Sequence, residues 1–169
     1  MEQVEQTNQT NFNKIKEFHN AFGLTLTNKP QQNVFENKSL VNLRLSLINE
    51  EVGELHQAVK EKNFTEVVDA LADILYVVYG AGASFGIDLD KAYDIVHKSN
   101  MTKLCTTKSE AEETVEWYKE QFKEGNVPYD TPAYRLSNDK KYYVVFNEST
   151  GKILKSINYT PADFRSILS

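Results

Sequence analysis

The chain contains one cysteine, four prolines and seven glycines in 169 residues, and it lacks a long apolar run. The scarcity of cysteine and the lack of such a run each exclude a class of protein. The lone thiol of Cys105 leaves no internal disulfide framework and no cysteine-rich zinc site. The longest uncharged apolar stretch, residues 74–87, is shorter than the roughly 18 to 20 residues needed to cross a bilayer. Residues 1–11 are polar and lack the apolar segment of a secretory signal. We therefore expect a cytoplasmic protein that binds no membrane.

The rest of the composition is that of an ordinary globular domain. Apolar residues make up 40% and charged residues 25% of the chain, which argues against disorder and low-complexity architecture. Nineteen basic against 24 acidic residues give a net charge of -5, the wrong sign for coating nucleic acid. We expect no stable binding of nucleic acid.

Apolar residues at helical spacing and capping residues predict five helices. The first is expected at 11–21, the second from a Ser39 cap to about 60, and the third from a Thr65 cap over 66 to about 85. The fourth starts at Asp88 or Asp90 and runs toward 99, and the fifth runs from a Ser109–Glu112 capping box to Gly125. Beyond them, residues 142–146 and 152–157 are predicted to form a hairpin around the turn at 147–151, and residues 160–163 a last helical turn.

These elements predict an all-α core, a bundle of four to five helices, with a small C-terminal β-hairpin tail. We expect residues 1–104 to form the helical core after a flexible start at 1–11, and residues 105–127 to form an additional helix. Residues 128–169 hold the irregular segment, the hairpin and the terminal turn. This last part is expected to belong to the same domain or to pack on a neighbouring subunit.

Acidic residues occupy unusual places on the second and third predicted helices. Glu51 and Glu54 fall within or at the edge of the apolar face of the second helix, while Glu50 lies further round. The third helix is apolar on almost all sides except a strip of Glu66, Asp69 and Asp73, at spacing i, i+3, i+7. No lysine or arginine occurs between residues 62 and 91. A carboxylate facing an apolar interior is costly unless it is protonated, paired or bound to a metal.

A short link between these two helices predicts antiparallel packing, which brings Glu51 and Glu54 opposite Asp69 and Asp73. Carboxylates without histidine or thiolate suit Mg²⁺, or alternatively Mn²⁺, and a polyphosphate commonly completes such a site. The competing interpretation is that these acids simply face solvent in a loosely packed bundle.

Two segments resemble the E-E-x-x-E and E-x-x-D signature of the all-α nucleotide pyrophosphohydrolase superfamily. They are EEVGEL at 50–55 and EVVDALADILY at 66–76. The superfamily includes MazG, dimeric dUTPases, dCTP pyrophosphatases and phosphoribosyl-ATP pyrophosphohydrolase. Residues 97–104 are similar to the stretch that closes its catalytic core, and GKILK at 151–155 resembles the tail of phage-type and virus-type members. Ala70 stands where many members carry glutamate, so the acidic pair is either Glu66 with Asp69 or Asp69 with Asp73.

The resemblance implies Mg²⁺-dependent hydrolysis of a nucleoside triphosphate, (d)NTP, to the monophosphate and pyrophosphate by a homodimer or homotetramer. It assigns catalysis to Glu51, Glu54, Asp69 and Asp73, and metal binding to the same four with Glu50 and Glu66. Substrate binding is expected from Asn100, Lys103 and Lys155, with Lys155 supplied by the same chain or by a neighbouring subunit. Two alternatives remain: hydrolysis of phosphoribosyl-ATP, and a non-catalytic helical module that binds a metal or a basic partner.

Overall fold

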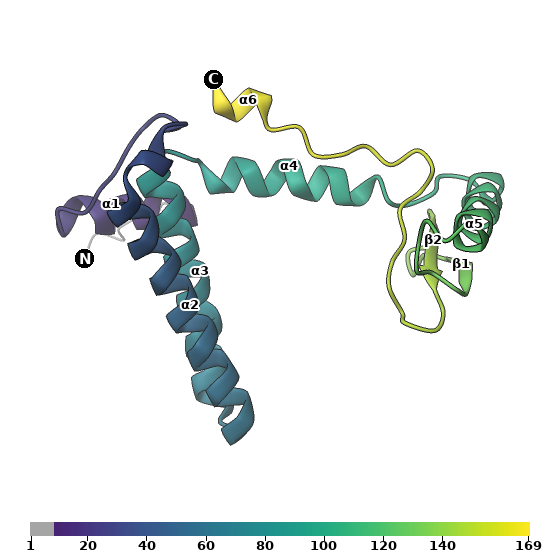
Figure 1. Cartoon of the computed structure of the whole chain (residues 1–169), viewed down its shortest axis with the longest axis horizontal. Helices are drawn as coiled ribbons and strands as arrows, with labels where there is room; N and C mark the ends of the chain where they lie inside the picture. The colour runs from purple at the N-terminus through teal and green to yellow at the C-terminus, as the bar shows by residue number, and fades with distance from the viewer. Residues whose placement is uncertain (1–8) are drawn as a thin grey trace, which may run out of the picture. The chain divides into compact units, whose positions relative to one another are not determined.

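A computed structural model describes residues 9–169, and most of the elements are helices (Figure 1). Of the predicted flexible start, residues 1–8 lie outside the described residues, whereas the side chain of Thr10 accepts a hydrogen bond from the Asn13 amide and caps α1 (Asn11–Ala21). The predicted first helix is therefore confirmed at both ends. A short 3₁₀ helix, η1 (Val34–Glu36), precedes the second helix.

The second and third helices form a long antiparallel pair with a two-residue link. α2 (Lys38–Glu61) is capped by Asn37 rather than by Ser39, and α3 (Phe64–Phe85) is capped by Asn63 rather than by Thr65. Both predicted caps were wrong by two residues because an asparagine carbonyl oxygen upstream takes the same role. Lys62 adopts a left-handed conformation (φ 56°) between the helices, and Figure 1 shows them side by side.

Two more helices follow, the first opened by Asp88 as predicted and the second with a corrected cap. α4 (Leu89–Met101) begins after Asp88, whose carboxylate accepts a hydrogen bond from the Lys91 amide. α5 (Lys108–Lys123) is capped by Thr107, so the Ser109–Glu112 capping box is wrong. Instead Thr107 Oγ1 accepts from the Glu110 amide, and Glu110 Oε2 accepts from the Thr106 amide. The same Ser/Thr and Glu chemistry operates two residues earlier.

The hairpin exists and the predicted strand at 142–146 is confirmed, but its predicted partner at 152–157 is wrong. β1 (Pro132–Leu136) pairs antiparallel with β2 (Tyr143–Asn147), whereas residues 152–157 contribute only an isolated bridge between Phe146 and Ile153. The terminal helical turn is α6 (Arg165–Leu168), later than the predicted 160–163. One side of the hairpin packs on α5 around Cys105, Ala111, Val115, Tyr118, Val145 and Leu154.

Contacts divide the chain into two compact units. The first comprises the residues up to Tyr93 together with Phe164–Ser169, and the second comprises Asp94–Asp163. The boundary between the two units lies inside α4. The first unit thus contains the α2–α3 pair, and the second contains α5 and the hairpin.

Candidate functional site

Glu51 is a half-buried acid near the middle of α2 in the α2–α3 pair. Its Oε2 atom is inaccessible to solvent and has no hydrogen-bond partner among the described residues. Burial raises the pKa of the Glu51 carboxyl, and the charges of Glu54, Asp73, Glu50 and Asp69 raise it further, in that order. Four predicted site carboxylates therefore act on Glu51, two from its own helix and two from α3.

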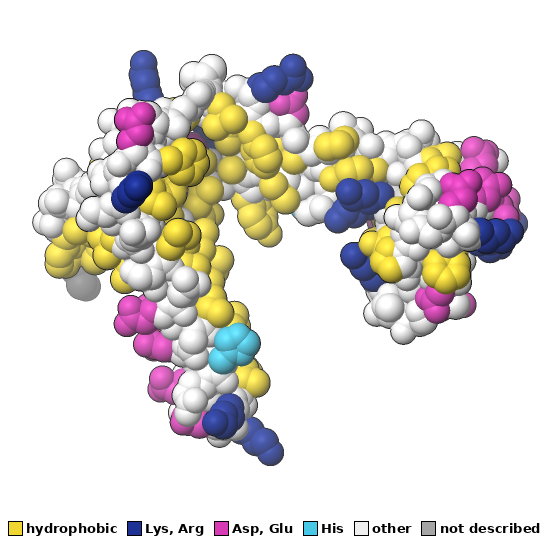
Figure 2. Space-filling model, viewed as in Figure 1, with side chains coloured by type: hydrophobic (Ala, Val, Ile, Leu, Met, Phe, Trp, Pro, Cys, Tyr) yellow, Lys and Arg dark blue, Asp and Glu magenta, His cyan; other side chains and the backbone are white. Residues whose placement is uncertain are grey.

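The acids of the pair are close neighbours but do not converge on one point. Within residues 9–169, no three side chains of His, Cys, Asp or Glu stand close enough together to hold a metal ion. Glu50, Glu54 and Asp69 are exposed, and Asp73 is half-buried. Figure 2 shows acidic side chains along one edge of the distal half of this helix pair and hydrophobic side chains along the other.

The donor set nevertheless suits a hard divalent cation. An unpartnered buried carboxylate oxygen costs about 1–3 kcal/mol, and the neighbouring carboxylates add repulsion instead of relieving it. A cation bound to Glu51 would remove both costs. The residues present therefore fit the magnesium that the sequence analysis predicted, while the set of ligands stays a prediction.

Glu66 has a different role in the structure from the other predicted acids. It occupies the first turn of α3, where its backbone amide donates to the Asn63 side chain at 3.3 Å. A carboxylate in the first turn of a helix is stabilised by the helix dipole. Glu66 is also absent from the charges that shift Glu51. Asp69 and Asp73, unlike Glu66, act on Glu51, and the choice between the two acidic pairs stays a prediction.

All three predicted substrate-binding residues belong to the second unit. The carbonyl of Lys103 accepts a hydrogen bond from the Ser156 amide at 3.3 Å, which places Lys103 next to the segment that carries Lys155. The Lys155 Nζ lies 4.5 Å from the centroid of the Tyr159 ring. Tyr159 in turn is hydrogen-bonded through its hydroxyl to Ser99, the neighbour of Asn100. The unit therefore gathers Lys103, Lys155 and the end of α4 in one region.

A buried cation on α2 was not predicted from the sequence. Arg44 is 5% exposed, its Nε has no partner among the described residues, and burial lowers the pKa of its guanidinium. A β-carbon at Gly80 would meet both Arg44 Nη1 at 3.5 Å and His19 Nε2 at 3.3 Å, so the three residues pack together. Arg44 lies seven residues before Glu51 and therefore on the same apolar face of the helix. This spacing was the signal in the sequence that could have predicted its burial.

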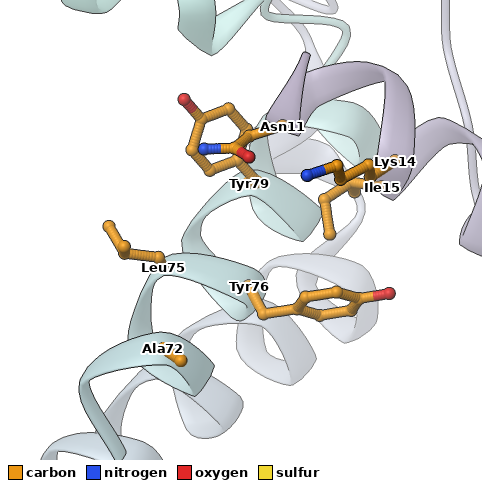
Figure 3. Close-up of a pocket in the computed structure, with 7 residues that line it drawn as sticks. All are labelled: Asn11, Lys14, Ile15, Ala72, Leu75, Tyr76 and Tyr79. Atoms are coloured by element: carbon orange, nitrogen blue, oxygen red, sulfur yellow. The ribbon is translucent and has the colours of Figure 1, made fainter. Parts of the chain in front are cut away.

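The sequence did not predict a cavity between α1 and α3 either. The cavity has a volume of about 220 Å³ and is lined by Asn11, Lys14, Ile15, Ala72, Leu75, Tyr76 and Tyr79 (Figure 3). Tyr76 lies three residues after Asp73 on α3, so one wall of the cavity is next to the acidic strip. Because the lining comes from two helices far apart in the sequence, periodicity along either helix could not reveal it.

An all-helical unit built on an acid-bearing antiparallel helix pair places the chain in the MazG-like class of all-α pyrophosphohydrolases. More narrowly, the family model described as phosphoribosyl-ATP pyrophosphohydrolase matches residues 15–100, and the chain belongs to this family. The matched segment contains Glu51, Glu54, Asp69 and Asp73 and ends at Asn100, before Lys103. Family membership supports the general function of a nucleotide pyrophosphohydrolase.

A relative from Acanthamoeba polyphaga mimivirus, described as an uncharacterised protein, is similar over nearly the whole chain. It is 32% identical over 243 aligned positions, which cover 94% of this chain and 96% of the relative. The alignment is longer than the 169 residues of the chain, so the relative carries segments without a counterpart here. The similarity extends past the family segment into the second unit, and it fits a virus-type member of the family.

Proposed function

We propose that the chain hydrolyses a nucleoside triphosphate to the monophosphate and pyrophosphate with Mg²⁺ as cofactor. The observation that supports this most directly is the buried, unpartnered Oε2 of Glu51 among four further carboxylates. Clustered carboxylates can act on a polyphosphate only when a cation mediates between acid and phosphate, because two anions repel.

In this proposal Glu51, Glu54 and Asp73 hold the metal, with Asp69 in support. A bound metal would neutralise the charge of the phosphates and would lower the pKa of the water that attacks the α-phosphorus. Lys103 offsets the charge that develops on the pyrophosphate leaving group, and Asn100 donates a hydrogen bond to the sugar or to a phosphate.

A panel of ribonucleoside and deoxyribonucleoside triphosphates with Mg²⁺, scored for pyrophosphate and for orthophosphate, tests the proposal. We expect pyrophosphate, and we expect Glu54→Gln and Asp73→Asn to abolish its release while the helical circular dichroism stays unchanged. Glu61→Gln is the matched control, since Glu61 lies at the end of the same helix and bonds to Gln57. Release of orthophosphate would indicate attack at the γ-phosphorus and would contradict the proposal.

Phosphoribosyl-ATP is the second candidate substrate, and the description of the matching family favours it. The same assay with phosphoribosyl-ATP decides between the two. A kcat/KM for phosphoribosyl-ATP that exceeds those of all free triphosphates by tenfold or more would replace the proposal by the biosynthetic activity.

We further propose that the chain is a homodimer or homotetramer, because the α2–α3 pair exposes much apolar surface. Phe64 is 80% and Leu75 is 58% exposed, and Leu43, Leu45, Val59, Val68 and Leu71 are exposed as well. Among the described residues α3 alone is long and apolar enough to cross a membrane by length and composition, with 28% of that window buried. Core helices of soluble proteins pass the same test. Sedimentation at micromolar concentration should show a dimer or tetramer; a monomer that partitions into vesicles would overturn the proposal.

A further inference from the structure

A second cavity of the first unit is lined by basic residues, although the chain as a whole is acidic. The cavity has a volume of about 280 Å³, and α1, the loop before η1 and α4 each contribute one lysine to its lining: Lys16, Lys29 and Lys91. Four other cavities in the described residues have a single basic residue among all their linings, Lys14. Lysines from three separate elements therefore meet at one place in a chain of net charge -5.

The loop that carries Lys29 is fixed to the end of α3. The backbone amides of Thr27 and Gln31 both donate to carbonyl groups of the last turn of α3, at 3.0 and 2.9 Å. Between these two bonds the Lys29 carbonyl oxygen lies so close to Gly86 that a β-carbon there would stand 1.8 Å from it. The backbone thus sets this wall of the cavity before any ligand binds, which limits the entropy lost on binding.

The other two lysines are held beside the same cavity. Lys16 Nζ lies 5.7 Å from the centroid of the Phe12 ring, and Phe12 also lines the cavity. Lys91 Nζ lies 3.5 Å from Asp88 Oδ2, and Asp88 lines the cavity as well. An aromatic ring attracts an ammonium group but does not neutralise its charge. Lys16 is therefore positioned by Phe12 and keeps its full positive charge.

The charges around the cavity do not cancel. Asp88 pairs with Lys91, whereas Lys16 and Lys29 have no salt-bridge partner among residues 9–169. Three lysines against Asp88 leave two positive charges, and counting a carboxylate at Ser169, which also lines the cavity, still leaves one. Neutral side chains with hydroxyl or amide groups complete the polar lining: Thr27, Asn28 and Ser166. Ammonium groups together with neutral hydrogen-bond donors are the chemistry that recognises a phosphate group.

The cavity is separate from the proposed metal site. Gly86, which lines it, follows Asp73 by thirteen residues, a rise of about 20 Å along the axis of α3. The phosphates of a nucleoside triphosphate are joined in one row. A substrate whose phosphates lie at the acids of α2 and α3 therefore leaves this cavity free for another anion.

We propose that this cavity is a second anion site, which binds a phosphate group as inorganic phosphate or as the monoester of a small molecule. Such a monoester carries about −1.5 to −2 charges at pH 7, which complements the unpaired Lys16 and Lys29. The volume lies just below the roughly 300–1,000 Å³ of pockets that enclose a whole drug-sized ligand, so the cavity suits a phosphate with a short organic group. Because these lysines lie outside the acidic strip, the site does not depend on the proposed hydrolysis.

Titration of the full chain with orthophosphate and with glycerol 3-phosphate, followed by ³¹P NMR in the presence of EDTA, tests the proposal. EDTA keeps the carboxylates of α2 and α3 free of metal, so that they repel the added anions. Sodium chloride holds the ionic strength constant, because salt screens exposed charges. We expect saturable binding of one phosphate group per chain. A higher affinity for glycerol 3-phosphate would support an organic phosphate as the ligand, and a higher affinity for orthophosphate would support inorganic phosphate.

The variants Lys16→Gln and Lys29→Gln should each weaken this binding roughly threefold, and the double variant roughly tenfold. Glutamine keeps most of the length of the side chain and removes only the charge. Lys60→Gln is the matched control, because Lys60 is an exposed lysine at the end of α2 and lines none of these cavities. Circular dichroism of all variants should remain that of the wild type.

Two results would overturn the phosphate site. The first is a wild type without saturable binding of either compound up to roughly 10 mM. The second is a double variant that binds phosphate as tightly as Lys60→Gln does; if the double variant fails to fold, Lys29→Gln, at an exposed loop position, decides in its place. Glu54→Gln should bind both compounds as the wild type does. A loss of hydrolysis in that variant with intact phosphate binding would therefore separate the two proposals.

Discussion

Replacing Glu51 by glutamine should stabilise the metal-free chain, although most substitutions of a half-buried residue destabilise a protein. The substitution removes a charge whose Oε2 has no hydrogen-bond partner among the described residues and whose pKa is raised by burial and then by like charges. The shape of the side chain is conserved, so packing changes little.

The size of the effect follows from the nearest like charge. Glu54 lies three residues further along α2, where side chains stand about 5–6 Å apart. Two unit charges about 6 Å apart repel by roughly 0.7 kcal/mol in water and roughly 3 kcal/mol at an effective dielectric constant of 20. The new amide donors offset part of this gain when buried. We therefore expect the free energy of unfolding to rise by about 1 kcal/mol, or Tm by about 2–4 °C for a chain of this size.

Thermal unfolding with and without Mg²⁺ measures both consequences. Wild type should gain stability with Mg²⁺, because a ligand that binds only the folded state stabilises it. Glu51→Gln should have a higher Tm than wild type without Mg²⁺ and should show no rise in Tm when Mg²⁺ is added. Glu61→Gln should match wild type in its metal-free Tm and in the rise with Mg²⁺. A metal-free Glu51→Gln variant that is less stable than wild type by 1 kcal/mol would show that Glu51 is a satisfied structural carboxylate and would refute the reasoning.

Three further predictions concern the fold and the second unit. Gly86→Ala should cost at least about 2 kcal/mol in urea unfolding, because φ is +75° and a β-carbon would stand 1.8 Å from the Lys29 carbonyl oxygen; Gly53→Ala, with open space around it inside α2, should gain up to about 1 kcal/mol. Burial and then the charge of Arg44 lower the pKa of His19. The contribution of His19 to stability is therefore complete above the ordinary pKa of about 6.5 and is lost as the pH falls below it. The free energy of unfolding should thus be lower at pH 5.5 than at pH 7.5, and His19→Gln should reduce this difference. Replacing Lys103 and Lys155 together by alanine should raise KM for the triphosphate roughly tenfold and leave the Mg²⁺-induced rise in Tm intact; an unchanged KM would remove both lysines from the site.

The helices could be predicted because their signals are local. Apolar spacing and the glycine after Phe85 place the end of α3, and Gly86 adopts the positive φ expected there. Strand pairing is not local, which explains the failure at the hairpin. Residues 152–157 follow an obvious turn, yet β2 takes Pro132–Leu136 as its partner because Tyr134 and Val145 then share the side that packs on α5.

The candidate site divides in the same way. The acids of α2 and α3 could be found in the sequence, because each lies at a fixed angle on its own helix. The packing of Arg44 with His19 and the lining of the cavity depend on where α1 meets the pair, which no single helix encodes. The buried cation was also easy to overlook because arginine between leucines reads as an ordinary exposed position.

The register of the helix pair explains the departure of this chain from the family pattern at Ala70. Arg44 of α2 packs against Gly80 of α3. Glu51 lies seven residues after Arg44, and Asp73, whose charge raises the pKa of Glu51, lies seven residues before Gly80. An antiparallel register pairs the residues of two helices in this way. Continuing that register places Ala70 level with Glu54, and Ala70 is 3% exposed. A glutamate there would add one more buried carboxylate beside Glu54, and without it the acids that α3 offers near this level are Asp69 and Asp73. The missing glutamate therefore favours these two aspartates as the ligands from α3, and it leaves Glu51 as the acid most in need of a cation.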